Sequence, residues 1–228
     1  MAQQYNFFAM VNRMKMIDRW ALMQNTSKEN IAEHSHSVAV IAHALALIGN
    51  KYYGKNYDEN RAAVLALYHD TTEVITGDMP TPVKYYNDEI KSVYKDIEDV
   101  AGKRLIAMLP DDFKADYEPF FTHNEEDKPL WKLVKAADKI SALIKCIEEN
   151  RMGNKEFEIA LKSQEKKIAD IDMPEVKYFC EHFLKAYYLT LDEHTKYRLC
   201  EACLNIDLSK RLRCAPRKCS RFIIEISF

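Results

Sequence analysis

The sequence predicts an all-helical protein, and two observations support this fold class. Only 5 glycines and 7 prolines interrupt the 228 residues, so few positions favour turns. Apolar residues recur with helical spacing along nearly the whole chain, and no stretch of useful length alternates as an exposed strand does. The chain also shows no internal repeat and no low-complexity linker. We therefore expect a helical bundle around one apolar core.

The helical pattern divides into seven segments. In the second, Asn30 is followed three residues later by Glu33, which resembles a capping box and marks a helix start. The third is apolar nearly all round up to Tyr68, so its inner end should be buried. The fifth has one apolar face with lysines nearby. The expected helices span residues 6–23, 30–52, 59–75, 84–108, 127–151, 154–170 and 174–190.

The charge balance argues against nucleic acid or a membrane surface as a partner. The chain has 33 basic and 35 acidic residues and a formal net charge of -2, so a bound anion must be held by local groups. There is no charged leader before an apolar core, and no apolar stretch approaches the roughly 20 residues of a membrane span. The six cysteines are read as reduced thiols. We expect a cytoplasmic protein.

Two histidines and two aspartates occupy positions where burial is expected. His34 is the first residue of an apolar stripe on the second helix. His69 and Asp70 lie at the inner end of the third, and Asp138 lies on the apolar face of the fifth. A carboxylate on such a face needs a partner. The stripe that follows His34 consists of Val38, Ile41, Leu45 and Ile48.

These four side chains have the composition of a metal site. Neighbouring helical side chains diverge by about 100°, close to the roughly 90° between octahedral ligands, so His69 and Asp70 can share one ion. His34 and Asp138 would complete a mixed set that suits Mn²⁺, Co²⁺, Fe²⁺, Ni²⁺ or Zn²⁺ better than Ca²⁺. Glu73 lies on the same side one turn later, where it could orient water or move protons.

The spacing alone leaves a structural interpretation open. A histidine at a helix end is more often a cap or a satisfied core residue than a ligand, and a His-Asp pair occurs often by chance. His36 and His43 lie outside the pattern and are assigned to packing or to the surface. Lys84 could attract phosphate, but a single lysine is usually solvated.

Longer motifs resemble a known family. The order H…HD…D resembles the HD-domain metal-dependent phosphohydrolases, and two motifs resemble the bacterial 5′-deoxynucleotidases of the YfbR type within that superfamily. The resemblance extends over about residues 6–193. The segments that resemble the superfamily are "AEHS" (32–35), "YHDTTEVITGDMPTPVKYYN" (68–87) and "KAADKISALIKCIEE" (135–149), and the more specific motifs are "RMKMIDRWALM" (13–23) and "GDMPTPVKYYN" (77–87).

The resemblance implies an HD-domain fold with one divalent transition metal (Co, Mn, Zn, Ni or Fe) in its core. It implies that His34, His69, Asp70 and Asp138 bind the metal and that Glu73 is the catalytic carboxylate. The implied reaction is hydrolysis of 5′-deoxyribonucleoside monophosphates to deoxynucleoside and phosphate. The alternatives are an HD phosphohydrolase for a triphosphate or cyclic nucleotide, and a non-catalytic nucleotide-binding regulator.

The resemblance also implies substrate contacts by Arg19, Trp20 and Asp78. A guanidinium grips phosphate oxygens as a fork, and an indole gives a flat wall that can exclude an extra hydroxyl. Without the resemblance, Arg19 could be a surface charge, Trp20 a core aromatic and Asp78 part of a turn. Members of the family are homodimers, and the aromatic-rich last helix offers a surface for such a contact.

We expect two parts, an HD phosphohydrolase domain over 1–194 and a basic extension over 195–228. The extension has eight basic and three acidic residues and contains the spacing Cys200-x2-Cys203-x10-Cys214-x4-Cys219. This spacing resembles a zinc knuckle. We favour an extension with little fixed structure, and a small zinc site or a nucleic-acid contact stays as the alternative.

Overall fold

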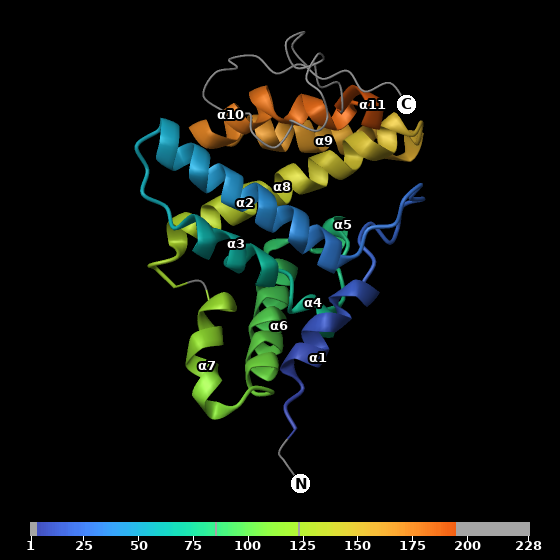
Figure 1. The fold of residues 1–228 in the computed structure, drawn as a ribbon. Helices are drawn as coiled ribbons and strands as arrows, with labels where there is room; N and C mark the ends of the chain where they lie inside the picture. The colour runs from blue at the N-terminus through green and yellow to red at the C-terminus, as the bar shows by residue number, and fades with distance from the viewer. Residues whose placement is uncertain (1–3, 85, 123, 195–228) are drawn as a thin grey trace, which may run out of the picture. The chain divides into compact units, whose positions relative to one another are not determined.

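The computed structural model describes residues 4–84, 86–122 and 124–194, and helices make up all the regular structure within these ranges (Figure 1). One isolated antiparallel bridge, between Asp18 and Asn30, is the exception. The prediction of an all-α fold is therefore confirmed. The chain forms two compact units, Met1–Leu184 and Lys185–Phe228. The predicted extension 195–228, with its cysteines, lies outside the described residues.

The helices of the first unit are α1 (Phe7–Val11), η1 (Asn12–Met16), α2 (Ile31–Tyr52), α3 (Glu59–Tyr68), α4 (Glu73–Thr76), α5 (Thr81–Lys84), α6 (Asp88–Ile106), α7 (Asp111–Tyr117), η2 (Glu118–Phe120), α8 (Lys128–Arg151), η3 (Lys155–Phe157), α9 (Glu158–Ala169) and α10 (Pro174–His182). The 3₁₀ helix η4 (Leu184–Tyr188) begins at the last residue of this unit. The helix α11 (Leu191–His194) belongs to the second unit.

The centre of the first unit is built from α2, α3 and α8, which pack against one another (Figure 1). The predicted capping box starts α2: the Asn30 side chain accepts from the Glu33 amide, and the Glu33 side chain accepts from the Asn30 amide. Below this cap His34 and the predicted stripe are buried. The long helix α8 buries a wider face, which places Asp138 beside α2. These helices position the candidate ligands.

By length and composition α2 would also qualify as a membrane span, contrary to the expectation from sequence. Its 22 residues include an 18-residue window with a mean hydropathy of 1.3. However, 56% of that window is buried inside the fold, and apolar core helices meet the same criterion. We interpret α2 as the core helix of the bundle.

A separate apolar cluster supports the C-terminal end of α3. It is centred on Phe7 of α1, Leu105 of α6 and Leu109. Tyr68, the last residue of α3, packs against it and stacks on Phe120 at 4.9 Å between ring centroids. Because Tyr68 directly precedes the predicted metal ligands, this cluster fixes the point at which α3 ends.

The predicted helix over 6–23 is wrong in its second half. The chain leaves η1 at an extended residue, Ile17, and pairs with the residues before α2: the amide of Arg19 donates to the carbonyl of Glu29 at 2.9 Å. The amide of Ile31 donates to the carbonyl of Ile17 at 3.0 Å. This pairing with the residues before α2 overrides the helical spacing of 17–23. The local sequence pattern could not reveal such a pairing.

Two further helix boundaries differ from the prediction. The helix expected over 59–75 stops at Tyr68 and resumes as α4 at Glu73, and the helix expected over 174–190 ends at His182. The short helix α7 was missed. Its start carries a signal, because Pro110 is followed by Asp111 and a second aspartate, and acidic residues favour the first turn of a helix.

Candidate metal centre and substrate site

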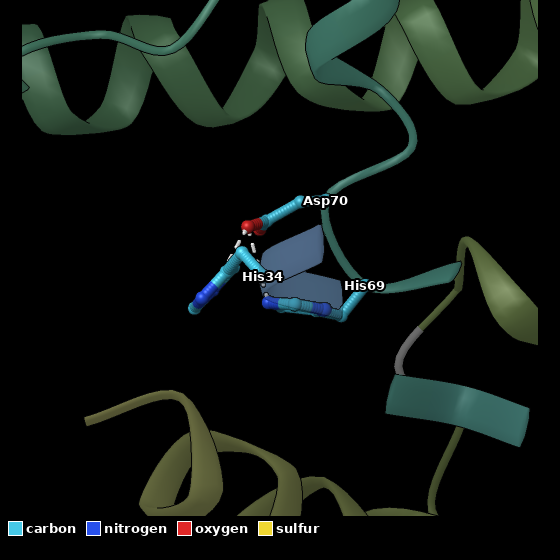
Figure 2. A group of neighbouring side chains, drawn as sticks. All are labelled: His34, His69 and Asp70. Carbon is cyan, nitrogen blue, oxygen red and sulfur yellow. Dashed lines mark ion pairs between the residues drawn. The ribbon is translucent and has the colours of Figure 1, made fainter. Parts of the chain in front are cut away.

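Three side chains from α2, α3 and the turn after α3 meet at one point (Figure 2). His34 belongs to α2 and is fully buried, His69 caps the C-terminus of α3, and Asp70 follows it. Nε2 of His69 lies 3.1 Å and Nε2 of His34 lies 3.5 Å from Oδ2 of Asp70. One candidate ligand atom from each residue lies within 4.8 Å of those of the other two. The three side chains could thus hold a metal ion.

The fourth predicted ligand, Asp138 of α8, lies next to this cluster. Its Oδ1 is 3.1 Å from Nε2 of His34. Its side chain is 41% exposed, whereas that of Asp70 is 23% exposed, so Asp138 stands on the more open side of the cluster. Asp138 thus lies beside His34 but outside the group of three whose candidate ligand atoms all lie within 4.8 Å of one another, so its role as fourth ligand stays a prediction.

The outer nitrogens of the two imidazoles are held by the protein. Nδ1 of His69 donates to the carbonyl of Ala66 at 2.7 Å, because a carbonyl can only accept, and Nδ1 of His34 lies 3.1 Å from Oγ of Ser141. Both Nε2 atoms are buried and face carboxylate oxygens at 3.1 Å without making a hydrogen bond to them. Ring nitrogens oriented in this way are typical of metal-binding histidines. The donor set thus fits a divalent transition metal.

Burial and charge shift the two imidazoles in opposite directions: burial lowers the pKa of His69, but the neighbouring Asp70 carboxylate outweighs it and raises that pKa. Burial and the nearby Arg19 guanidinium lower the pKa of His34, which favours its neutral ring. Burial would raise the pKa of Asp70, but the interaction with His69 and the charge of Arg19 outweigh it and hold that pKa below its usual range. A neutral imidazole beside an ionised carboxylate is the state that binds a cation.

Glu73 lies beside the cluster, and no described hydrogen bond or ion pair joins its side chain to the cluster. As the first residue of α4, it follows a turn in which its amide donates to the carbonyl of Asp70 at 3.0 Å. Its side chain is buried and its Oε2 has no hydrogen-bond partner. Burial, followed by the negative charges of Asp70 and Asp78, raises the pKa of Glu73 to about 10 in the metal-free protein. This carboxyl is therefore available to a ligand.

Arg19 is not the exposed surface charge that the structural alternative required. Its side chain is only 13% exposed, and its Nη1 lies 2.7 Å from Oε2 of Glu29. Its Nη2 lies 3.9 Å from Oδ1 of Asp138. The guanidinium thus stands at the edge of the metal cluster. Sequence reasoning missed Glu29, because nothing in the local pattern links it to Arg19.

Trp20 adopts a strained backbone conformation. Its φ is +57°, a region that costs a residue with a side chain about 1–2 kcal/mol. Its ring packs on Phe157 at 5.4 Å between centroids and lies 6.0 Å from the Arg19 guanidinium carbon. Its Nε1 is buried and has no hydrogen-bond partner. Strain of this kind persists only where the surroundings enforce it, and it concentrates at functional sites.

The segment after α4 carries two further charged groups, Asp78 and Lys84, whose charges influence the pKa of Glu73. Gly77, at φ +72°, turns the chain before Asp78, and burial together with the Asp70 charge raises the pKa of Asp78 against the opposing effect of Arg19. Lys84 is not simply solvated: its Nζ lies 2.9 Å from Oε1 of Glu98. The pairing raises the pKa of Lys84 although burial lowers it. His36 is exposed and His43 is half-buried, as expected.

The chain matches known proteins over most of its length. The family described as 5′-deoxynucleotidase YfbR-like matches residues 6–187. A 5′-deoxynucleotidase from Vibrio vulnificus is 48% identical over 191 residues, which cover 84% of this chain and 98% of that protein. A 5′-deoxynucleotidase from Shewanella oneidensis is 46% identical over the same coverage.

Solved structures share the fold. An HD-domain phosphohydrolase from Listeria innocua has a TM-score of 0.70 and 24% identity, and the match covers 80% of this chain and 88% of that chain. The HD phosphohydrolase of cyanophage S-2L, bound to dA and one catalytic Zn²⁺ ion, has a TM-score of 0.55 and 21% identity, with 80% and 99% covered. The solved structures show that the chain has the HD-domain fold, and the sequence matches show that it belongs to the YfbR-like family of 5′-deoxynucleotidases.

Proposed function

We propose that this protein hydrolyses 5′-deoxyribonucleoside monophosphates to a deoxynucleoside and phosphate. The relatives named 5′-deoxynucleotidase match this chain at nearly half identity over almost their whole length. The observation that carries the proposal is the buried cluster of His34, His69 and Asp70, in which two imidazole nitrogens have no hydrogen-bond partner. A metal-dependent hydrolase needs such a cluster.

The residues that would hold the metal are His34, His69, Asp70 and Asp138. A divalent ion bound there supplies a Lewis acid that polarises the phosphoryl group and makes water more acidic. The metals that suit these donors are Co, Mn, Zn, Ni and Fe. Zinc has direct support from the cyanophage neighbour, which contains one catalytic Zn²⁺.

The protein groups around the cluster have separate tasks in this proposal. Arg19 grips the phosphate, since it is already oriented by Glu29 at the edge of the cluster. Glu73 orients the attacking water or carries a proton to the leaving 5′-oxygen. Trp20 stands against the deoxyribose, and Asp78 helps to hold the nucleotide. Lys84 adds positive charge near Glu73, since each influences the other's pKa.

Two alternatives fit less well. A triphosphatase is less well supported, because residues 1–194 contain no glycine-rich phosphate loop and no dense basic cluster suited to a triphosphate. A non-catalytic regulator would have no use for Glu73, a buried carboxyl with one unpaired oxygen beside a candidate ligand set. The dA ligand of the cyanophage neighbour is a deoxynucleoside, the class of product that the proposed reaction would release.

We propose that the protein acts in the cytoplasm as a homodimer on small nucleotides. The near-neutral net charge gives no basis for nucleic-acid or anionic-membrane binding. The family resemblance supports the dimer. Size-exclusion chromatography with light scattering would test this assembly.

The reaction is tested by phosphate release from 5′-deoxy, 5′-ribo and 3′-monophosphates, with Mn²⁺, Co²⁺, Mg²⁺ or Zn²⁺ added singly to metal-stripped protein. We expect hydrolysis of 5′-deoxynucleotides that depends on a transition metal and exceeds hydrolysis of the other two classes. Equal rates on the 3′-monophosphates, or full activity after metal removal, would contradict the proposal.

A further inference from the structure

The segment that carries Arg19 and Trp20 is anchored before the tryptophan. The amide of Arg19 donates to the carbonyl of Glu29 at 2.9 Å, and the amide of Ile31 donates to the carbonyl of Ile17 at 3.0 Å. These two bonds attach the start of the segment to the start of α2. They leave the chain after Trp20 to be fixed by other groups.

A buried carboxylate on α8 supplies a second anchor after the tryptophan. Glu149 is 0% exposed and accepts from the amides of Thr26 and Ser27 at 2.9 and 3.0 Å. Lys145, one turn earlier on α8, contacts the same carboxylate and the carbonyl of Ser27. Asn154 donates to Oε2 of Glu149 at 2.7 Å. Two backbone amides and two side chains thus converge on Glu149.

The same network extends to Trp20 from two directions. Asn154 also donates to the carbonyl of Gln24 at 2.7 Å, and Asn25 donates to the carbonyl of Trp20 at 3.1 Å. Phe157, in the 3₁₀ turn that Asn154 caps, packs directly on the Trp20 ring. The backbone after Trp20 and the aromatic wall behind it are therefore tied to one carboxylate.

The placement of Glu149 indicates a role in positioning. Burying a carboxylate is costly unless it is fully partnered, and here its partners lie in the 24–27 segment, on α8 or at Asn154. Fully satisfied polar networks make the parts that they join rigid. A rigid anchor on each side is what a strained residue such as Trp20 needs.

We propose that Glu149, with Lys145 and Asn154, is a positioning group that holds Trp20 against the deoxyribose and so sets the preference for deoxynucleotides over ribonucleotides. This inference rests on the proposed function of the site. Glu149 acts through Trp20 and touches none of the candidate metal ligands in the contacts described. Loosening the network should let the indole move away, so that the 2′-hydroxyl of a ribonucleotide is tolerated.

The mildest test is Asn154→Ser. Serine can still cap the turn before Phe157, while both hydrogen bonds from the Asn154 amide are removed. We expect the ratio of kcat/KM for dAMP to that for AMP to fall by about 3- to 10-fold, within the roughly 10²-fold range available for rejecting one added hydroxyl. In a Trp20→Ala background the same substitution should leave the ratio unchanged. A folded Glu149→Gln variant should lower this ratio more than Asn154→Ser does.

Matched controls separate positioning from general weakening. Asn150→Ser and Glu148→Gln make the same chemical changes on α8, and no contact described joins either side chain to the 24–27 segment. If Asn154 has a merely structural role, Asn154→Ser should lower kcat/KM for dAMP and for AMP by the same factor. That result, or an equal fall in the ratio with and without Trp20, would overturn the proposal.

A measurement without substrate tests the positioning role of Glu149 separately from the proposed function. In a Trp131→Phe background Trp20 is the only tryptophan, since the chain has two. We expect Asn154→Ser to increase quenching of Trp20 fluorescence by acrylamide in the metal-free protein, and Asn150→Ser to leave it unchanged. If the wild type hydrolyses no deoxynucleotide, the proposed function fails, whereas unchanged quenching would overturn the positioning role by itself.

Discussion

His34 and Asp138 meet across the core of the bundle, with 3.1 Å between Nε2 and Oδ1. One comes from the capped start of α2 and the other from the middle of α8, and these two helices pack directly on each other. The candidate metal cluster is thus attached to two helices that pack directly on each other and bury much of their length. A ligand can be removed there without removing the apolar contacts that hold the helices together.

The first prediction concerns Asp70. Asp70→Ala should abolish metal binding and activity while the protein stays folded, because the side chain is part of a charged cluster and not of the apolar core. The measurements are metal content and melting temperature with and without added metal. The wild type should gain stability from the ion by mass action, and the variant should not.

The control for this variant is Asp96→Ala, which removes an exposed aspartate from α6. It should keep both the metal and the rise in melting temperature. If Asp70→Ala retains a full complement of metal, the assignment of Asp70 as a ligand is wrong.

The second prediction separates Arg19 from Trp20. Trp20→Ala should narrow the difference in kcat/KM between dAMP and AMP, because the indole crowds the 2′ position. Arg19→Ala should lower kcat/KM for both nucleotides by a similar factor, since both carry the same phosphate. Steady-state kinetics of the two variants on the two nucleotides provide the test. An unchanged dAMP to AMP ratio in Trp20→Ala would remove the indole from sugar selection.

The sequence predicted that His34, His69 and Asp70 lie close together, because its signals there are local. The capping box at Asn30 and Glu33 fixes where α2 begins, and the apolar stripe after His34 fixes which face is buried. The end of the fifth helix follows from the same periodicity, whereas the third helix ends at Tyr68, earlier than the periodicity predicts. Local spacing is sufficient for His34, which belongs to a regular helix, whereas His69 and Asp70 lie where α3 ends.

The substrate side could not be predicted in the same way. Trp20 at φ +57° and the pairing of Arg19 with Glu29 depend on contacts between segments that are not helical. Glu149 has the appearance of an ordinary charge near a helix end, and its burial follows from backbone amides 122 and 123 positions away. Side chains that act through such non-local contacts leave no periodic signal.

The third prediction concerns the pH dependence of stability. Burial would raise the pKa of Glu149, but the hydrogen bonds from Lys145, Asn154 and the two amides lower it to about 2 from 4.5. Because the folded-state pKa is lowered, the carboxylate contributes stability above about pH 4.5 and loses it as the pH falls towards 2. Denaturant unfolding of wild type and Glu149→Gln should therefore differ most near neutral pH and converge in that window. A difference that is constant from pH 7 to pH 3 would contradict the assignment.

The last prediction concerns Glu73 and decides between an enzyme and a binder. Its carboxyl is buried beside the cluster, has one unpaired oxygen, and is not among the residues that bond to the imidazoles. General acid–base groups typically contribute about 10²- to 10⁴-fold in rate. Glu73→Ala should therefore lower kcat by a factor in that range, with metal content and the Kd for deoxynucleotide nearly unchanged, since its interaction is made mainly in the transition state. Loss of the ion would instead make Glu73 a ligand or its support, and an unaltered kcat would exclude it from the mechanism.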